Sequence, residues 1–393
     1  MGAGSVLTTG PVFLGQRNMY TTICTFETLL AAYYKARSCK RYKSTILKFG
    51  FYLENNLFRL QKDLMNETYL PSAYVCFTVH DPKERKVAAP HFRDRVCQHA
   101  LISAIDPLFE KTFIYDSYAC REQKGTHFGL SRIKKFLQAA RSFYGPEAEV
   151  YYLSMDISKF FASMSRDILL SLIFRKVSCP KTKKLIEKIV THYQFFNEKG
   201  QPFNPAPIVL TPWEQKGLPI GNLTSQLFAN VYLNELDQFV KHTLRLRWYG
   251  RYMDDFIFIH KDKEYLHKIK DTVSEFLQDK LKLTLSERKI IIANVTNGVP
   301  FVGYRIFYDH VLVRGKTLLH MQRRFKKRKK RRTYGKITEE QLKSSINSFL
   351  GHFQHANAWK LKQRMFTLNE RYSRKKKYSN KPNIFWDKDE LGL

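Results

Sequence analysis

The chain has 393 residues, of which 44% are hydrophobic, so it can bury a sizeable core in two or three subdomains and does not fit global disorder. Its 67 Lys and Arg residues against 35 Asp and Glu residues give a formal net charge of +32. Such an excess favours a polyanionic partner, with nucleic acid first and an acidic membrane surface second. No run of about 18 apolar residues occurs, so no membrane-spanning helix is expected.

Cysteine usage and the N-terminus favour a cytoplasmic location. The six cysteines are scattered without a C-x-x-C pair, which predicts reduced thiols that mostly fill the core. The N-terminus has no basic stretch followed by an apolar one, so a secretory signal is not expected. Residues 1–17 are rich in glycine and are predicted to form a flexible arm.

The first part of the chain is mainly helical by pattern. Apolar residues recur at helical spacing in the stretches Thr25–Arg37, Ile46–Leu64, Phe92–Phe109 and Phe128–Phe143. Tyr74–Val79 has strand composition and leads through a turn into a second strand that ends near Pro90. The basic residues Lys83 and Arg85 of this turn are either a solvated hairpin tip or functional.

A single acid ends the next strand. The apolar segment Glu149–Phe161 has strand composition and contains Asp156, followed by two aromatic residues. The C-terminal end of a core strand is a common place for a catalytic or metal-binding acid. The alternative is a helix N-cap, although Ser165 or Asp167 would cap the following helix better.

A turn of small residues precedes the next helix. Lys216–Gln226 contains Gly, Pro and Asn and is expected to lead into a helix from Leu227 to about Val240. Such a turn lets a ligand approach the backbone closely. It matches neither a Walker A loop nor G-x-G-x-x-G, so it is a weak phosphate-binding signal.

Two adjacent acids lie in a predicted β-hairpin. Asp254 and Asp255 stand between aromatic and β-branched residues, and an alternating apolar run follows. Neighbouring carboxylates repel each other and cannot both be buried without a cation, and a hard divalent ion such as Mg²⁺ would resolve the conflict. The alternative is a solvated Asp-Asp turn.

Four features follow the hairpin: an amphipathic helix at Tyr265–Leu281, the segment Leu283–Lys289, a hairpin at Pro300–Ile306, and a last amphipathic helix or helix pair at Ser344–Phe366. Between the last two, nine of the ten residues from Arg323 to Arg332 are basic. At this density a surface that binds a nucleic-acid backbone is favoured over a solvated helix face.

The order of these features resembles the reverse transcriptase family over about residues 70–310. The motifs that carry the resemblance are Pro82–Arg85, Asp156 with Phe161, the turn 217–226, Tyr252–Asp255, Leu283–Lys289 and Phe301–Tyr304. The resemblance implies an α+β, right-hand polymerase with fingers, a palm built on an antiparallel sheet, and a helical thumb. It places the flexible arm at 1–17, the fingers at 18–150, the palm with fingers-like insertions at 151–310, the thumb at 311–370 and a basic tail at 371–393.

The resemblance also implies RNA-templated DNA synthesis from dNTPs with two Mg²⁺ ions. By position, the implied catalytic residues are Asp156, Asp254, Asp255 and Lys289, with Lys289 as the general acid for pyrophosphate. The implied metal-binding residues are Asp156, Ile157, Asp254 and Asp255. The implied dNTP-binding residues are Lys83, Arg85, Phe161, Ile220 and Gln226, of which Phe161 excludes the 2′-hydroxyl of ribonucleotides. The implied primer grip comprises Phe301, Gly303 and Tyr304, and the residues implied to follow the nucleic-acid backbone are Arg323, Arg324, Lys326, Lys327 and Arg328.

The turn 217–226 also carries a subfamily signal. Most reverse transcriptases have Gln where this chain has Ile220 and Pro where it has Gln226. The turn is similar to the version in diversity-generating retroelements, whose enzymes make error-prone cDNA with errors concentrated at adenines. Our hypothesis is that Ile220 removes an amide near the nascent base pair and so lowers fidelity.

Two alternatives to the retroelement role stay open. One is a bacterial antiphage defence reverse transcriptase that copies a non-coding RNA. A remote alternative is a non-catalytic, basic RNA-binding scaffold, against which the intact acids argue. A group II intron maturase fits less well, because no DNA-binding or nuclease-like extension is expected after the thumb.

The resemblance further implies the partners of the chain. They are a template RNA and the RNA/DNA duplex, dNTPs, and a structured non-coding RNA. A small basic accessory protein or a second copy of the chain are further candidates, and no membrane partner is expected.

Overall fold

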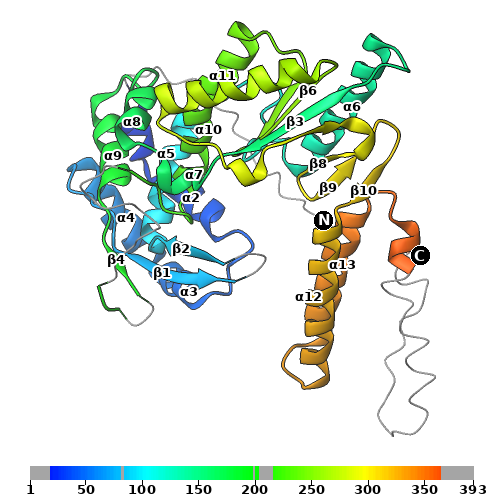
Figure 1. Ribbon diagram of the computed structural model, residues 1–393. Coiled ribbons are helices and arrows are strands. Elements are labelled where there is room, and N and C mark those ends of the chain that lie inside the picture. Colours follow the sequence, from blue (N-terminus) through cyan, green and yellow to red (C-terminus); the bar gives the residue numbers. More distant parts are fainter. Residues whose placement is uncertain (1–17, 81–83, 198–199, 203–215, 364–393) are drawn as a thin grey trace, which may run out of the picture. The chain divides into compact units, whose positions relative to one another are not determined.

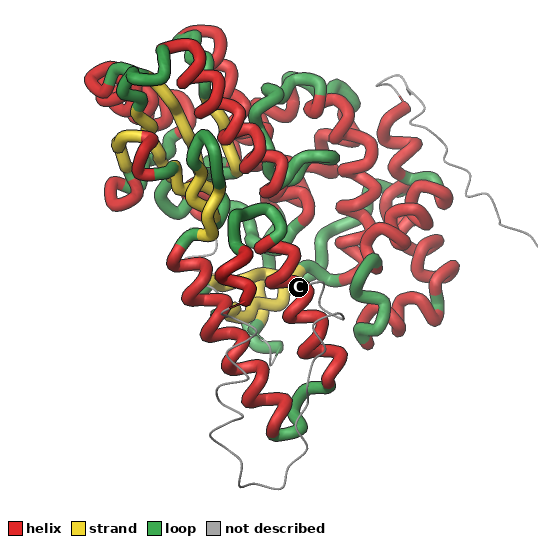
Figure 2. Tube along the Cα trace, turned by 90° about the vertical axis from the view of Figure 1, so that its right-hand side faces the viewer, coloured by secondary structure: helices red, strands yellow, loops and turns green. Residues whose placement is uncertain are grey.

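A computed structural model describes residues 18–80, 84–197, 200–202 and 216–363 (Figure 1). The described residues form two compact units: unit 1 draws on 1–125, 155–256 and 267–290, and unit 2 on 126–154, 257–266 and 291–393. Helices predominate, and the strands form separate small sheets (Figure 2), so the fold is α+β as predicted. The predicted arm 1–17 and tail 371–393 lie outside the described residues.

Unit 1 opens with the helices α1 Met19–Ile23, α2 Phe26–Arg37, α3 Ser44–Phe51, α4 Leu53–Met65 and α5 Phe92–Glu110. The Thr25 hydroxyl caps α2: it accepts a hydrogen bond from the Thr28 N–H at 3.3 Å. The prediction of one helix over Ile46–Leu64 was wrong. Tyr52 has φ −112° and ψ 44°, which breaks the helical hydrogen bonding and separates α3 from α4.

A three-stranded sheet of unit 1 has the order β2-β1-β4, with the strands β1 Tyr74–Val79, β2 Arg85–Ala89 and β4 Phe195–Phe196. β1 and β2 are antiparallel with Val79 opposite Arg85, which confirms the predicted strand pair. β2 lies at the edge of the sheet, and its Ala88 N–H donates to the Ile220 carbonyl at 2.9 Å. The turn before α10 is therefore attached to this edge.

The remaining helices that contribute to unit 1 are α7 Phe160–Ser163, α8 Arg166–Phe174, α9 Pro180–Thr191, α10 Leu223–Gln238, the π-helical turn Phe239–Thr243 and α11 Lys263–Leu281. α10 has buried residues around most of its circumference, as a central helix requires. It begins at Leu223, not at Leu227 as predicted. The Gln98 side chain accepts a hydrogen bond from the Leu223 N–H at 3.2 Å, so Gln226 lies in the first helical turn rather than in the loop.

A four-stranded sheet has the order β5-β6-β3-β7, with the strands β3 Tyr151–Asp156, β5 Tyr249–Tyr252, β6 Asp255–His260 and β7 Ile291–Asn294. β3 and β7 are antiparallel, with Tyr151 opposite Asn294. The four residues Phe256–Ile259 of β6 are all buried, so this strand is covered on both faces. The predicted strand that ends in Asp156 and the predicted acid hairpin are both confirmed.

Unit 2 contains α6 Thr126–Tyr144, a sheet of order β10-β9-β8 and two long helices, with the bounds β8 Val299–Phe301, β9 Tyr304–Ile306, β10 Val311–Val313, α12 Gly315–Thr333 and α13 Glu339–Phe353. Phe349 and Phe353 of α13 pack with Phe325 of α12. α13 begins five residues before the predicted start at Ser344, because Thr338 and Gln341 form a capping box.

All six cysteines are free thiols, and four of them are buried, as predicted. Among the described helices, none combines the length and the apolar character needed to cross a bilayer.

Candidate active site

Asp156 lies at the C-terminal end of β3 with only 7% of its surface exposed. Its backbone carbonyl accepts a hydrogen bond from the Ser286 N–H at 2.8 Å, and its carboxylate forms an ion pair with the ammonium group of Lys289. The alternative role as a helix cap is wrong, because the Ser165 hydroxyl accepts the hydrogen bond from the Ile168 N–H at the start of α8.

The paired acids occupy the connection between β5 and β6. Met253 and Asp254 form the two-residue turn, and Asp255 is the first residue of β6. Met253 has φ 55°, in the left-handed region that a non-glycine residue rarely adopts. The tight turn leaves Asp254 and Asp255 half-buried, so the alternative of a freely solvated Asp-Asp loop does not hold.

The three carboxyl groups interact strongly. Burial raises the pKa of Asp254, and the negative charge of Asp156 raises it further. Burial, a hydrogen bond with Asp156 and the charge of Asp254 raise the pKa of Asp255 to about 7. The Lys289 ammonium group lowers both pKa values but does not offset the burial and mutual repulsion of the three acids.

This donor set fits a hard divalent cation. Carboxylate oxygens are the protein ligands that Mg²⁺ prefers, and a cation would remove the repulsion that raises both pKa values. Within the described ranges, no three acidic, His or Cys side chains already surround one point as metal ligands. In this arrangement the Lys289 ammonium group supplies the positive partner of Asp156. The side chain of Ile157 is apolar and 1% exposed, so only its backbone could contribute a ligand.

Two predicted cationic residues lie beside the acids. The Lys289 side chain is 48% exposed, which leaves its ammonium group accessible to a ligand while it pairs with Asp156. The charge of Arg85 is among the influences that lower the pKa of Asp254, so the edge strand β2 brings it near the turn. Lys83 lies outside the described residues.

Phe161 and the turn before α10 are joined by backbone hydrogen bonds. The Leu218 N–H donates to the Phe161 carbonyl at 2.8 Å. Gly221 has φ 129°, and a Cβ there would lie 2.5 Å from the Ala88 carbonyl oxygen, so only glycine permits this close approach to β2. Ile220 is half-buried and Gln226 is exposed. The turn thus contacts Phe161 through Leu218 and β2 through Ile220, and the nucleotide-binding roles of Phe161, Ile220 and Gln226 stay predictions.

The predicted primer-grip residues belong to unit 2 and form the β8–β9 hairpin. The side chains of Phe301 and Tyr304 are buried, and the Tyr304 hydroxyl donates to the His352 carbonyl at 2.9 Å. Of the three predicted residues, only Gly303, at φ 92°, offers surface to a ligand. Its role in holding a primer remains a prediction.

The predicted backbone-binding residues lie on α12. Arg323, Arg324, Lys326 and Lys327 are exposed, whereas Arg328 is half-buried and directs its guanidinium group toward the Gln341 carbonyl at 3.4 Å. α12 therefore presents a dense positive surface in unit 2, and Arg328 helps to hold α13.

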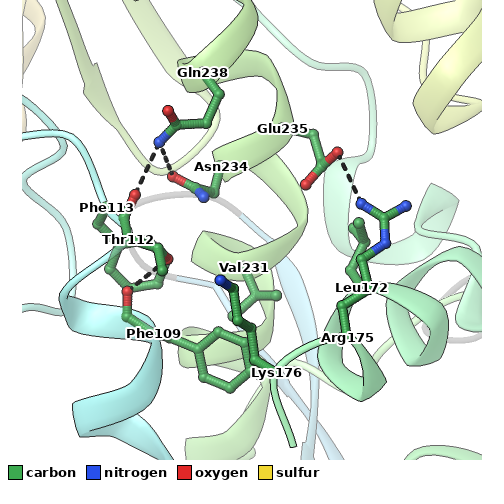
Figure 3. A pocket seen from close by; sticks show the side chains of 10 residues that line it. All are labelled: Phe109, Thr112, Phe113, Leu172, Arg175, Lys176, Val231, Asn234, Glu235 and Gln238. Carbon is green, nitrogen blue, oxygen red and sulfur yellow. Dashed lines mark hydrogen bonds and ion pairs between the residues drawn. The ribbon is translucent and has the colours of Figure 1, made fainter.

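A pocket of about 490 Å³ lies in unit 1 beside the end of α5, α8 and α10 (Figure 3). An ion pair between Arg175 and Glu235, 3.4 Å apart, forms part of its lining, and the Gln238 side chain donates to the Thr112 carbonyl at 2.8 Å. None of the predicted site residues lines this pocket.

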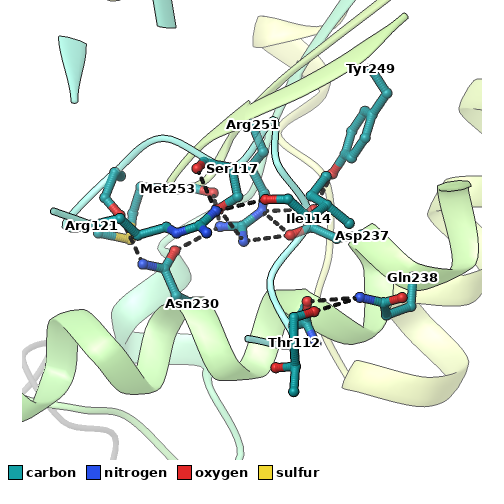
Figure 4. A network of polar contacts seen from close by, with 12 residues as sticks. Thr112, Ile114, Ser117, Arg121, Asn230, Asp237, Gln238, Tyr249, Arg251 and Met253 are labelled. Atoms are coloured by element: carbon teal, nitrogen blue, oxygen red, sulfur yellow. Dashed lines mark hydrogen bonds and ion pairs between the residues drawn. The ribbon is translucent and has the colours of Figure 1, made fainter. Parts of the chain in front are cut away.

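Arg251 is a functional candidate that sequence reasoning missed. Its guanidinium group is fully buried directly behind the acid turn (Figure 4). The sequence did contain a signal for this residue, because a charged side chain two positions before the turn of an otherwise apolar hairpin needs a partner. Its partners, however, are 14, 21 and 134 residues away in the chain and follow no local pattern.

Comparison with known proteins gives a consistent result. A family model described as reverse transcriptase (RNA-dependent DNA polymerase) matches residues 80–306, more than half of the chain. The chain is 25% identical to Protein YkfC of Escherichia coli over 281 residues, covering 63% of this chain and 70% of that protein. It is 24% identical to the group II intron-encoded protein LtrA of Lactococcus lactis over 322 residues, covering 64% of this chain and 50% of that protein.

Among solved structures, an apo telomerase from Candida tropicalis truncated from its C-terminal domain aligns with a TM-score of 0.46 and 14% identity. The alignment covers 66% of this chain and 60% of that one. This chain thus spans about half the length of LtrA and less than two thirds of the aligned telomerase.

Proposed function

Because the chain belongs to the reverse transcriptase family, whose members are RNA-directed DNA polymerases, we propose that it copies an RNA template into DNA. The observation that carries this proposal is the cluster of Asp156, Asp254 and Asp255 with Lys289 at its edge. Two Mg²⁺ ions held by the three acids would stabilise both the attacking and the leaving oxygen of the nucleotidyl transfer.

The residues of the chain have distinct tasks in this proposal. The three carboxylates set the position of the primer 3′-hydroxyl relative to the triphosphate. Lys289 gives its proton to the departing pyrophosphate, and Arg85 pairs with a triphosphate oxygen. Phe161 packs where the 2′-hydroxyl of a ribonucleotide would lie and so favours dNTPs.

The larger divisions of the chain follow from the same family. We assign the fingers to 18–150, the palm to 151–310 and the thumb to 311–370, in a protein of the cytoplasm. The exposed basic residues of α12 are suited to the phosphate backbone of a template–primer duplex, which they would bind by charge and not by base sequence.

We further propose error-prone cDNA synthesis for a diversity-generating retroelement. Support comes from Ile220, whose carbonyl accepts a hydrogen bond from β2 and whose half-buried, apolar side chain offers no amide to a base pair. The Ile220→Gln variant tests this directly. Misincorporation opposite template adenine should fall several-fold, as cDNA sequencing would show, whereas an unchanged error spectrum would contradict the proposal.

The antiphage defence role remains the second candidate, because the same acids and the same basic α12 would serve it equally. Sequencing of the RNA and cDNA that co-purify with the protein separates the two roles. A template with a matching variable repeat supports the retroelement role. A structured RNA without repeats supports the defence role, and RNA without any cDNA supports the non-catalytic scaffold.

A further inference from the structure

Arg251 of β5 uses every donor of its guanidinium group within unit 1. Its Nε donates to the Asp237 carboxylate at 2.8 Å, and its Nη2 donates to the same carboxylate at 2.6 Å and to the Ser117 hydroxyl at 3.0 Å. Its Nη1 donates to the Asn230 side-chain oxygen and to the Met253 carbonyl, each at 3.1 Å. Arginine has five N–H donors, so none is left over for water.

The partners of Arg251 are rigidly placed. Asn230 and Asp237 lie seven residues apart on α10 and therefore on the same helix face. Asp237 also accepts a hydrogen bond from the Tyr249 hydroxyl at 2.7 Å. All of these side chains, together with Ser117, are at most 1% exposed. Figure 4 shows the guanidinium group between α10 and the turn that carries Met253.

The contact with Met253 reaches the strained part of the acid turn. Met253 has φ 55°, which places its carbonyl within reach of the arginine two residues earlier. A non-glycine residue keeps such a conformation only where its surroundings hold it. Arg251 holds Met253 in this conformation through the hydrogen bond to its carbonyl. The next residue is Asp254, so this hydrogen bond lies directly beside the first acid of the turn.

We propose that Arg251 is a positioning residue that locks the Met253–Asp254 turn to α10, so that Asp254 and Asp255 face Asp156 in the geometry needed to bind metal. The same helix begins beside Ile220, so Arg251 connects the acid turn with the helix that follows the proposed nucleotide-binding turn. This inference rests on the proposed polymerase function.

Charge pairing alone does not explain the arrangement. A buried ion pair contributes little net stability compared with apolar residues of similar size, and a lysine could neutralise Asp237. Only the planar fork of arginine can bind Asp237 with two donors and still reach Asn230, Ser117 and the turn carbonyl. The Arg251→Lys variant therefore keeps the positive charge but loses the hydrogen bonds that hold the turn to α10.

The experiment compares Arg251→Lys with Arg93→Lys. Arg93 is a matched control because its guanidinium group pairs with Asp94 at 3.3 Å and donates to the Leu70 carbonyl at 2.6 Å, away from the acid turn. Each variant is measured by thermal unfolding, by binding of an RNA–DNA primer duplex, by Tb³⁺ luminescence titration without nucleotide, and by single-nucleotide extension with Mg²⁺.

For Arg251→Lys we expect kcat to fall by about tenfold or more and the Tb³⁺ concentration at half-saturation to rise several-fold. Duplex binding and KM for the dNTP should change by less than about twofold. Arg93→Lys should leave kcat, KM, Tb³⁺ binding and duplex binding near their native values and should change only Tm. If Arg251→Lys does not fold, Asn230→Ala combined with Ser117→Ala removes two of the fork's partners and should show the same pattern.

The inference is overturned if Tb³⁺ binding and kcat stay at native values in the folded variants, or if they fall only in proportion to the folded fraction. Failure of the proposed function is a separate result: the native protein would then extend no primer. The Tb³⁺ titration would still decide whether Arg251 positions the acids.

Discussion

The Asp255→Asn variant should stabilise the metal-free protein while it impairs the enzyme. The pKa of Asp255 is raised from 3.8 to about 7 by burial, by its hydrogen bond with Asp156 and by the charge of Asp254. The folded protein therefore binds more protons than the unfolded chain between about pH 4 and pH 7, and its stability falls as the pH rises through this window. Asparagine removes the titrating group and its repulsion.

The magnitude follows from the same pKa values. Each pKa unit corresponds to about 1.4 kcal/mol. At pH 5 the folded protein keeps the Asp255 proton that the unfolded chain has lost, which costs roughly 2 kcal/mol of stability, and at pH 8 the carboxylate is charged in the folded protein and the cost is roughly 4 kcal/mol. The stabilisation by Asp255→Asn should therefore grow by about 2–3 kcal/mol between these two pH values.

The assay is urea denaturation of both proteins at pH 5 and pH 8 in EDTA, with Asp279→Asn as the control for loss of an exposed aspartate on α11. Saturating Mg²⁺ should reduce the difference in free energy of unfolding between Asp255→Asn and the native protein, because the native site binds the ion more tightly. A variant that is destabilised at pH 8, or whose gain is the same at both pH values, would refute the electrostatic account of the acid cluster.

Three further predictions concern the nucleotide and duplex sites. Phe161→Ala should reduce discrimination against ribonucleotides by about tenfold or more, measured as the ratio of kcat/KM for dNTP and rNTP, whereas an unchanged ratio would remove Phe161 from the sugar pocket. Gly221→Ala should displace the turn from β2, because its Cβ would lie 2.5 Å from the Ala88 oxygen. The variant should therefore have a higher KM for dNTP and a lower Tm, and native values of both would contradict the close approach. Replacing Arg323, Lys326 and Lys327 with Gln should weaken duplex binding and lower the slope of log K against log salt by about one per lost phosphate contact, and an unchanged slope would show that α12 does not bind the duplex.

Local sequence patterns predicted the elements that carry the acids. The expected alternation of burial along the acid hairpin is not observed, because the four residues Phe256–Ile259 of β6 are all buried. The strand before Asp156 and the hairpin around Asp254 were nevertheless predicted correctly, because their aromatic and β-branched residues favour strands. The strand pair before and after Arg85 was predictable for the same reason.

Contacts between distant residues were not predictable in this way. The start of α10 depends on Gln98, which is 125 residues away, and helical periodicity carries no information about it. The break at Tyr52 occurs inside a continuous apolar pattern. The arginine network of the acid turn likewise joins a strand, a helix and a loop whose only relation is their packing.

The central claim is that Asp254 belongs to a metal-dependent polymerase site, and Asp254→Asn tests it most directly. The measurement is extension of a DNA primer on an RNA template with Mg²⁺, together with binding of the same duplex. We predict that the variant binds the duplex as well as the native protein does and makes no extended product. Extension at the native rate by the variant would contradict the assignment of the site.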